Sequence, residues 1–239
     1  MIRNKPLLIL STAIFLTVEA ALGVWLQLAS GRTVSVVCFS SIVLACLFCG
    51  IFIAKKPSYL LTQLALLFTL CADIFLVLIP QRQQLVGMLF FSVAQLLYFL
   101  RLLLDDPNRA RRRVHLITRC ALIAIVLLVT VLVLRKTTDA LALVSMFYYT
   151  NLVVNLIFAF AQFSRQGLMA VGFVLFLLCD TLIGLAFIDP YFTIPEGSFI
   201  HTLLYPGFDP AWACYLPSQM LLAISLLPER LKECRMIRL

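Results

Sequence analysis

Three acidic side chains lie inside long apolar stretches of this sequence. Glu19, Asp73 and Asp180 each have mainly hydrophobic residues on both sides along the chain. A carboxyl group in such surroundings is costly to keep ionised, so it is a functional candidate by default. Burial favours the uncharged form of a carboxyl group, and a second carboxylate nearby favours it further. A pair of such groups could therefore divide the roles of general acid and general base.

The composition places these acids in a membrane protein. The chain has 239 residues, of which 63% are hydrophobic and 13% charged, and its mean hydropathy is +1.05. A soluble domain is usually about half apolar and a quarter charged. A fold of this size cannot hide so many apolar side chains from water. The composition thus excludes a soluble enzyme, a disordered chain and a disulfide-stapled secreted module.

Eight apolar stretches have the length of a transmembrane helix, which needs about 20 residues. They are 6–29, 33–54, 59–79, 85–104, 114–134, 140–163, 168–188 and 211–227. We predict an all-α, polytopic membrane bundle of eight transmembrane helices that forms a single domain, residues 1–239. The segment LCADIFL around Asp73 is similar to LCDTLIGL around Asp180, which suggests a four-plus-four helix repeat, 1–113 and 114–239.

The basic residues predict the orientation of this bundle. Of the 19 Lys and Arg residues, 15 fall on one side of the predicted membrane and four on the other. The four are Arg32, Arg82, Arg135 and Lys136. The larger group marks the cytoplasmic side, which places both termini there. We expect a bacterial cytoplasmic membrane. No Lys or Arg is expected deep in a span, so the three acids would have no permanent ion-pair partner.

One run of arginines begins the predicted fifth span. It consists of Arg109, Arg111, Arg112 and Arg113. Basic residues directly beside a span attract the anionic headgroups of the cytoplasmic leaflet. We therefore expect lipid headgroups as the partners of this run, and no nucleic acid.

Polar side chains on other predicted helices could form the walls of a cavity around the acids. Residues three, four or seven positions apart share a helix face, and several polar residues follow this spacing. The candidates for substrate binding are Gln95, Tyr98, Tyr148, Asn151, Asn155, Tyr215, Gln219 and the acid Glu19, while Asp73 and Asp180 are the catalytic candidates. The alternative is that the amides and hydroxyls only join helices to one another. We expect neither a metal nor a cofactor.

The stretch 64–101, LALLFTLCADIFLVLIPQRQQLVGMLFFSVAQLLYFLR, resembles the lysoplasmalogenase (YhhN-like) family of membrane proteins. That family has an acidic segment, then Phe/Leu-x-Gly-x-x-x-Phe, then a polar residue and Tyr. The segment GFVLFLLCDTLIGL, 172–185, is similar to its second acidic segment. The matching motif residues are Gly87, Phe91, Tyr98, Tyr215 and Gln219. The sequence departs from the family at Gln95, where members often carry His.

The resemblance implies hydrolysis of the vinyl ether bond of lysoplasmalogens to a fatty aldehyde and glycerophosphoethanolamine or glycerophosphocholine. Asp73 and Asp180 would then act as general acid and general base, in an order that the sequence leaves open. Two other functions fit buried acids in a helical bundle. One is a proton-coupled transporter or lipid exporter, and the other is a non-catalytic lipid-binding membrane protein.

Overall fold

The computed structural model of the chain describes residues 5–28, 32–53, 57–79, 83–187, 195, 197–199, 201 and 209–236. Within these ranges the regular structure is helical and contains no strand. Eight of the helices are long and apolar enough to cross a membrane, which confirms the predicted all-α bundle. The spans contain α1 (Lys5–Leu28), α2 (Arg32–Phe48), α3 (Pro57–Asp73), α4 (Gln84–Asp105), α5 (Arg109–Leu134), α6 (Ala140–Phe160), α7 (Phe163–Ala186) and α9 (Pro210–Ile224). Four spans continue beyond the α-helix they contain: those of α2, α3, α5 and α9 end at Ile51, Leu78, Thr137 and Leu231.

Side-chain caps fix the first residues of three helices. Asn108 accepts hydrogen bonds from the first backbone amides of α5, at 3.0 and 3.1 Å. Asp139 caps α6 through Ala142 N at 2.7 Å. Asp209 caps α9 through Trp212 N at 3.2 Å. Each cap satisfies amides that have no partner within the helix, so these polar residues have a local structural role outside the hydrocarbon.

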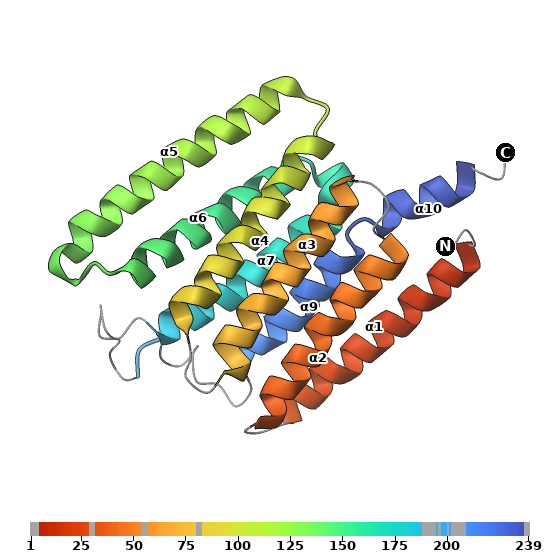
Figure 1. Cartoon of the computed structure of the whole chain (residues 1–239), viewed down its shortest axis with the longest axis horizontal. Coiled ribbons are helices and arrows are strands. Elements are labelled where there is room, and N and C mark those ends of the chain that lie inside the picture. Colours follow the sequence, from red (N-terminus) through yellow and green to blue (C-terminus); the bar gives the residue numbers. More distant parts are fainter. Residues whose placement is uncertain are drawn as a thin grey trace.

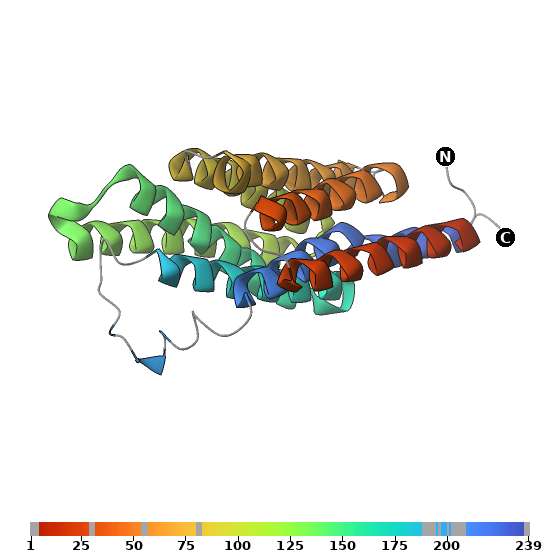
Figure 2. The same cartoon turned by 90° about the horizontal axis from the view of Figure 1, so that it is seen from below.

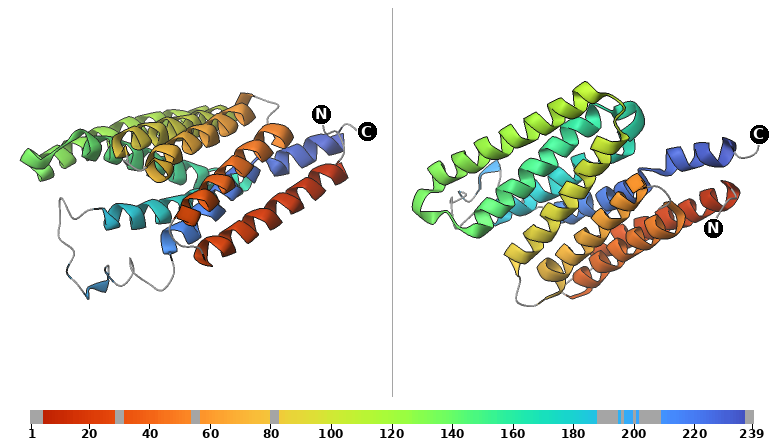
Figure 3. Two further views of the ribbon diagram at one scale, coloured as in Figure 1. Left: turned by 60° about the horizontal axis from the view of Figure 1, so that its bottom comes forward. Right: turned by 45° about the horizontal axis from the view of Figure 1, so that its top comes forward.

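Seven of the spanning helices form a closed ring. The order of packing is α1, α2, α3, α4, α6, α7 and α9, and α9 returns to α1. Because α2 also packs against α9, the ring is flattened, with α2 and α3 in a layer beside α1 and α9 (Figure 2). Helix α5 lies outside this ring against α6 (Figures 1 and 3) and is the least buried of the eight candidate spans.

The chain enters and leaves the bundle at one end. Helix α1 begins and the short helix α10 (Leu227–Met236) ends at this end, which we call the termini side (Figure 1). Helices α2, α4, α6 and α9 run toward the termini side, and α1, α3, α5 and α7 run away from it. The assignment of the termini side to the cytoplasm and the four-plus-four repeat stay predictions.

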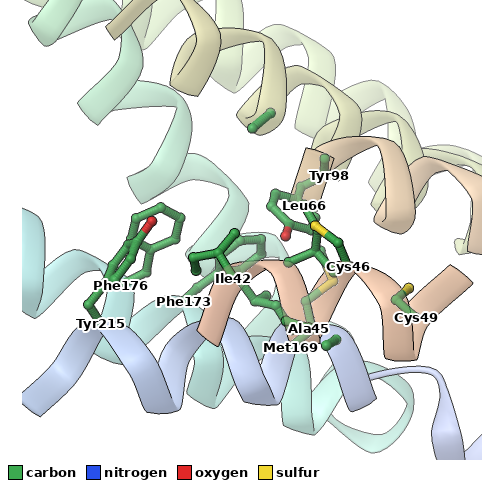
Figure 4. Close-up of a cluster of buried hydrophobic side chains, with 14 of the residues drawn as sticks. Ile42, Ala45, Cys46, Cys49, Leu66, Tyr98, Met169, Phe173, Phe176 and Tyr215 are labelled. Carbon is green, nitrogen blue, oxygen red and sulfur yellow. The ribbon is translucent and has the colours of Figure 1, made fainter. Parts of the chain in front are cut away.

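The centre of the ring is filled by apolar side chains from facing helices. Figure 4 shows Ile42 and Cys46 of α2 close to Met169 and Phe173 of α7, with Tyr98 of α4 beside them. All five are 5% exposed or less. Cys46 behaves here as a small apolar side chain. In the described part of the chain, no group of three or more His, Cys, Asp or Glu residues could hold a metal ion.

A close approach of α3 and α4 depends on one glycine. Directly after Asp73, the helix continues as a single π-helical turn, η2 (Ile74–Leu78). Leu76 of this turn lies over Gly87, where an added Cβ atom would be 2.5 Å from Leu76 Cγ. A π-helical turn inside a helix is frequent at functional sites. Because Gly87 has no side chain, the π-helical turn after Asp73 has room to pack against α4.

We predict that Gly87→Ala lowers the thermal stability of the detergent-solubilised protein. The added methyl group must displace the branched part of Leu76, and overpacking of this kind costs roughly 1–3 kcal/mol. A second substitution, Leu76→Ala, should recover part of the loss in the double variant. Gly23→Ala is the matched control, because no atom lies within 4 Å of a Cβ added there. Equal melting temperatures for the two single variants would contradict the packing argument.

Candidate active site

Asp73 and Asp180 each accept a hydrogen bond from a tyrosine on another helix. Tyr215 of α9 donates its hydroxyl to Asp73 Oδ2 at 2.7 Å. Tyr148 of α6 donates to Asp180 Oδ2 on the neighbouring helix α7. Asp73 is buried, and Asp180 is half-buried. Among the described residues no hydrogen bond reaches Oδ1 of either carboxyl group. Each group is thus held through one oxygen while the second remains available to a ligand.

A row of aromatic rings joins the two carboxyl–tyrosine pairs. The ring of Phe91 lies 5.4 Å from that of Tyr148 and 5.8 Å from that of Phe176, between centroids. The Phe176 ring in turn lies 5.8 Å from that of Tyr215, and Figure 4 shows these two side by side. Both carboxyl–tyrosine pairs therefore belong to one site. We call Asp73 and Asp180 together the carboxyl pair.

Several buried polar atoms have no hydrogen-bond partner in the described part of the chain, and four neutral ones lie on α3, α4 and α9. These four are Thr69 Oγ1, Gln95 Nε2, Tyr98 Oη and Gln219 Oε1. We call these four residues the polar layer. Thr69 lies one turn before Asp73, and Gln219 lies one turn after Tyr215. An unsatisfied buried polar group costs roughly 1–3 kcal/mol, so the polar layer is arranged to meet a polar ligand or water.

The two asparagines of α6 belong to a network behind this layer. Asn155 donates to both the backbone oxygen and Oε1 of Gln95, each at 2.9 Å. Arg119 of α5 donates to Oδ1 of Asn151 and of Asn155. Its guanidinium also lies over the Phe99 ring, 4.1 Å from the centroid. Both asparagines therefore attach α5 to α6, and Asn155 also holds Gln95 of the polar layer.

Two basic side chains are buried inside the bundle, which the sequence did not predict. Arg101 is 0% exposed and Arg119 is 4% exposed. The signals that could have located Arg101 are its position inside the fourth span and Asp105 one turn later, 3.6 Å away. Even so, neither ion pair of the described residues, Arg101–Asp105 or Arg111–Asp106, includes an acid of the predicted trio. These three carboxyl groups have neutral hydrogen-bond donors instead.

Glu19 lies apart from the carboxyl pair. It is 3% exposed on α1 and accepts a hydrogen bond of 2.6 Å from Ser41 Oγ on α2. Its Oε1 atom has no partner among the described residues. No described contact joins Glu19 to Asp73 or Asp180. The structure thus brings together two of the three predicted acids.

An apolar groove lies on the other side of Tyr148 from the polar layer. It has a volume of about 510 Å³ and separates the outer parts of α5 and α6. Its lining is entirely hydrophobic: Leu127, Leu128, Val131, Leu143, Val144 and Phe147. Phe147 directly precedes Tyr148. The groove lies on the side of α6 that faces α5, whereas Tyr148 donates to Asp180 on the side that faces α7.

Comparison with known proteins assigns this arrangement to a family. The model of the YhhN family matches residues 32–226, well over half of the chain. The chain belongs to the YhhN family. This is the lysoplasmalogenase-like family, so the resemblance inferred from the sequence is confirmed. The matched region contains Asp73 and Asp180 and leaves out Glu19. No curated protein and no solved structure matches the chain significantly.

We predict that two Tyr→Phe substitutions differ in their effect on stability. Tyr215→Phe removes the donor to Asp73 and should lower stability by about 1 kcal/mol. Tyr98→Phe removes a fully buried hydroxyl that has no partner, so thermal unfolding in detergent should show an unchanged or raised melting temperature. A loss of stability in Tyr98→Phe as large as that in Tyr215→Phe would show that the Tyr98 hydroxyl is satisfied within the protein.

Proposed function

We propose that this protein is a membrane-embedded hydrolase that cleaves the vinyl ether bond of lysoplasmalogens. The products are a fatty aldehyde and glycerophosphoethanolamine or glycerophosphocholine. Membership of the lysoplasmalogenase-like family supports this type of reaction. The observation that carries the proposal is the carboxyl pair itself: Asp73 and Asp180, each held by a tyrosine, on either side of one aromatic row. On the predicted orientation, the protein would lie in a bacterial cytoplasmic membrane.

The chemistry needs one carboxyl group that is protonated and one that is ionised. The protonated group transfers its proton to the β-carbon of the vinyl ether, which leaves an oxocarbenium ion and a carboxylate. The ionised group then takes a proton from water as the water oxygen bonds to the cationic carbon. The resulting hemiacetal breaks its bond to the glycerol oxygen, which receives that proton, while the hydroxyl proton returns to the first carboxylate. Both groups recover their starting states.

The protein environment suits these two roles. Burial favours a neutral carboxyl group, and a nearby carboxylate favours the neutral form of its neighbour. Glycosidases use a related pair of carboxyl groups around a related oxocarbenium ion. Neutral tyrosine donors can orient both groups without the permanent positive charge of Arg or Lys, which would favour ionisation of both. Asp73 and Asp180 could exchange the roles of acid and base, and either assignment satisfies the proton balance.

The surroundings of the carboxyl pair suit a single-chain amphiphile. The polar layer, Thr69, Gln95, Tyr98 and Gln219, offers donors and acceptors to water and to the glycerol side of the lipid. The groove between α5 and α6 offers hydrocarbon walls to the alkenyl chain. In this proposal the headgroup lies toward the termini side and the reactive bond lies between the two carboxyl groups. Gln95 Nε2 can position water but cannot exchange protons as the histidine of other members could.

We predict that Asp73→Asn and Asp180→Asn each abolish aldehyde release. An amide neither donates an acidic proton nor accepts one from water, so the rate should fall by at least about 100-fold, the typical contribution of a general acid or base. The measurement is aldehyde formation from lysoplasmalogen by the purified protein.

Glu19→Gln is the matched control, because it converts the third intramembrane acid into an amide away from the carboxyl pair. It should keep most of the activity. The wild-type rate in either aspartate variant would exclude the two-carboxylate mechanism. If the wild-type protein releases no aldehyde while a proton gradient drives lipid movement, the transporter is supported instead.

A second prediction concerns the hydrocarbon groove. Val144→Trp fills the α5–α6 groove and should slow the cleavage of long-chain lysoplasmalogens more than that of short-chain ones. Val129→Trp adds the same bulk on the exposed surface of α5 and should leave this ratio unchanged. Rates are compared for alkenyl chains of different lengths. Equal loss for long and short chains in Val144→Trp would place the substrate chain elsewhere.

A further inference from the structure

The first turns of α5 form a basic cavity on the termini side of the bundle. The cavity has a volume of about 300 Å³ and is lined by Leu103 from the last turns of α4 and by Arg109, Arg112, Arg113 and Leu116 from α5. Three of its five lining residues are cationic and two are apolar. Ligand cavities in proteins generally begin at about 300 Å³, so the space suits a small charged group with an attached apolar part.

The structure separates the fourth arginine of this run from the other three. Arg111 donates to Asp106 Oδ2 at 2.5 Å and to Oδ1 at 2.7 Å, and it also donates to the backbone oxygen of Ala161 at 3.0 Å. Arg111 holds the pKa of the Asp106 carboxyl below its usual value through these bonds. Arg111 is therefore committed to joining the α4–α5 connection to the end of α6.

The acidic residues beside the cavity already interact with side chains outside it. Asp106 pairs with Arg111, and Asp105 lies 3.6 Å from Arg101 and accepts from Gln166 at 3.3 Å. Within the part of the chain that the structure describes, no carboxylate forms an ion pair with Arg109, Arg112 or Arg113. Asp106 interacts with Arg112 only at longer range, so the cavity carries three positive charges without a close carboxylate partner among the described residues.

We propose that this cavity binds the phosphate of an anionic phospholipid in the membrane leaflet on the termini side. Arg109, Arg112 and Arg113 would contact the phosphate, because guanidinium groups match the geometry of phosphate oxygens. Leu103 and Leu116 would contact the beginning of the hydrocarbon chains. This site differs from the carboxyl pair, and the inference does not depend on the proposed reaction.

Two observations favour a lipid over a soluble phosphate. The cavity has leucines in its walls, and the next exposed residue along α5 is Ile117, whose side chain is 69% exposed at the membrane surface of the bundle. Helix α5 also packs outside the ring and is the least buried span (Figure 3). A lipid bound between its first turns and α4 would add contacts where the protein supplies few, so binding should also stabilise α5.

Lipid binding to the full-length protein in detergent tests this proposal. The probes are a phosphatidylglycerol and a phosphatidylcholine with the same chains, with adducts counted by native mass spectrometry and stability followed by thermal unfolding. Phosphatidylglycerol should form one preferred adduct and raise the melting temperature. The variant R109Q/R112Q/R113Q should bind it on the order of 100-fold more weakly, because each basic residue near an anionic surface contributes several-fold.

The matched control is R135Q/K136Q, which removes two exposed cations from the opposite end of α5 and should bind as the wild type does. If the triple variant does not fold, Arg112→Gln alone removes the half-buried arginine of the cavity and should weaken binding about fivefold. Unchanged phosphatidylglycerol binding in the arginine variants would overturn the proposal. It would also be overturned by equal binding of phosphatidylcholine, which indicates unspecific annular lipid, or by equal stabilisation with glycerol 3-phosphate, which indicates a site for soluble phosphates.

Discussion

The packing of the ring depends on one buried cation, Arg101, and on the hydrogen bonds that its guanidinium group donates to other helices. The Arg101 side chain is fully enclosed, and a buried charge is costly unless the protein supplies it with hydrogen-bond partners. The partners come from three other parts of the chain: Thr62 of α3 at 3.0 Å, Gln166 of α7 at 2.9 Å and Ser225 at the end of α9 at 2.7 Å. One guanidinium group thereby fixes the distances between four helices on the termini side. Tyr98 lies one turn away on α4, so the polar layer begins next to this fixed point.

The carboxyl pair is hydrogen-bonded differently from Arg101, because the carboxyl groups could have met cations but do not. Asp73 and Asp180 meet neutral hydroxyl donors rather than cations, an arrangement that restrains a carboxyl group without favouring its ionised form as strongly as an arginine would. Phe91 and Phe176 stand between the two tyrosines, so the distance across the site is set by packed rings. Such rings have few torsional degrees of freedom, which suits a site that must hold two acids at a defined separation.

The arginines of α4 and α5 thus occupy four different environments. Arg101 is the interior anchor of the ring, and Arg119 attaches α5 to α6 through two asparagines. Arg111 ties the α4–α5 connection to the end of α6. The remaining three line the basic cavity at the membrane surface. A count of positive charge beside a span cannot distinguish these positions, because they differ only in the neighbours that folding brings to each side chain.

The sequence by itself determined the all-α architecture, the eight spans and the family, because a bilayer requires about 20 apolar residues per helix and leaves buried acids conspicuous. Spacing along single helices also placed Gln219 beside Tyr215, since residues four apart share a face. Only the tertiary structure decided that Tyr215 meets Asp73 across 142 residues of chain, that Glu19 lies with Ser41, and that Arg101 is interior. A helix that is apolar on every side carries little pattern to show which face meets which neighbour. Helix rotation and neighbour choice are therefore fixed by packing and by the pairing of a few buried polar groups, and these become visible only in three dimensions.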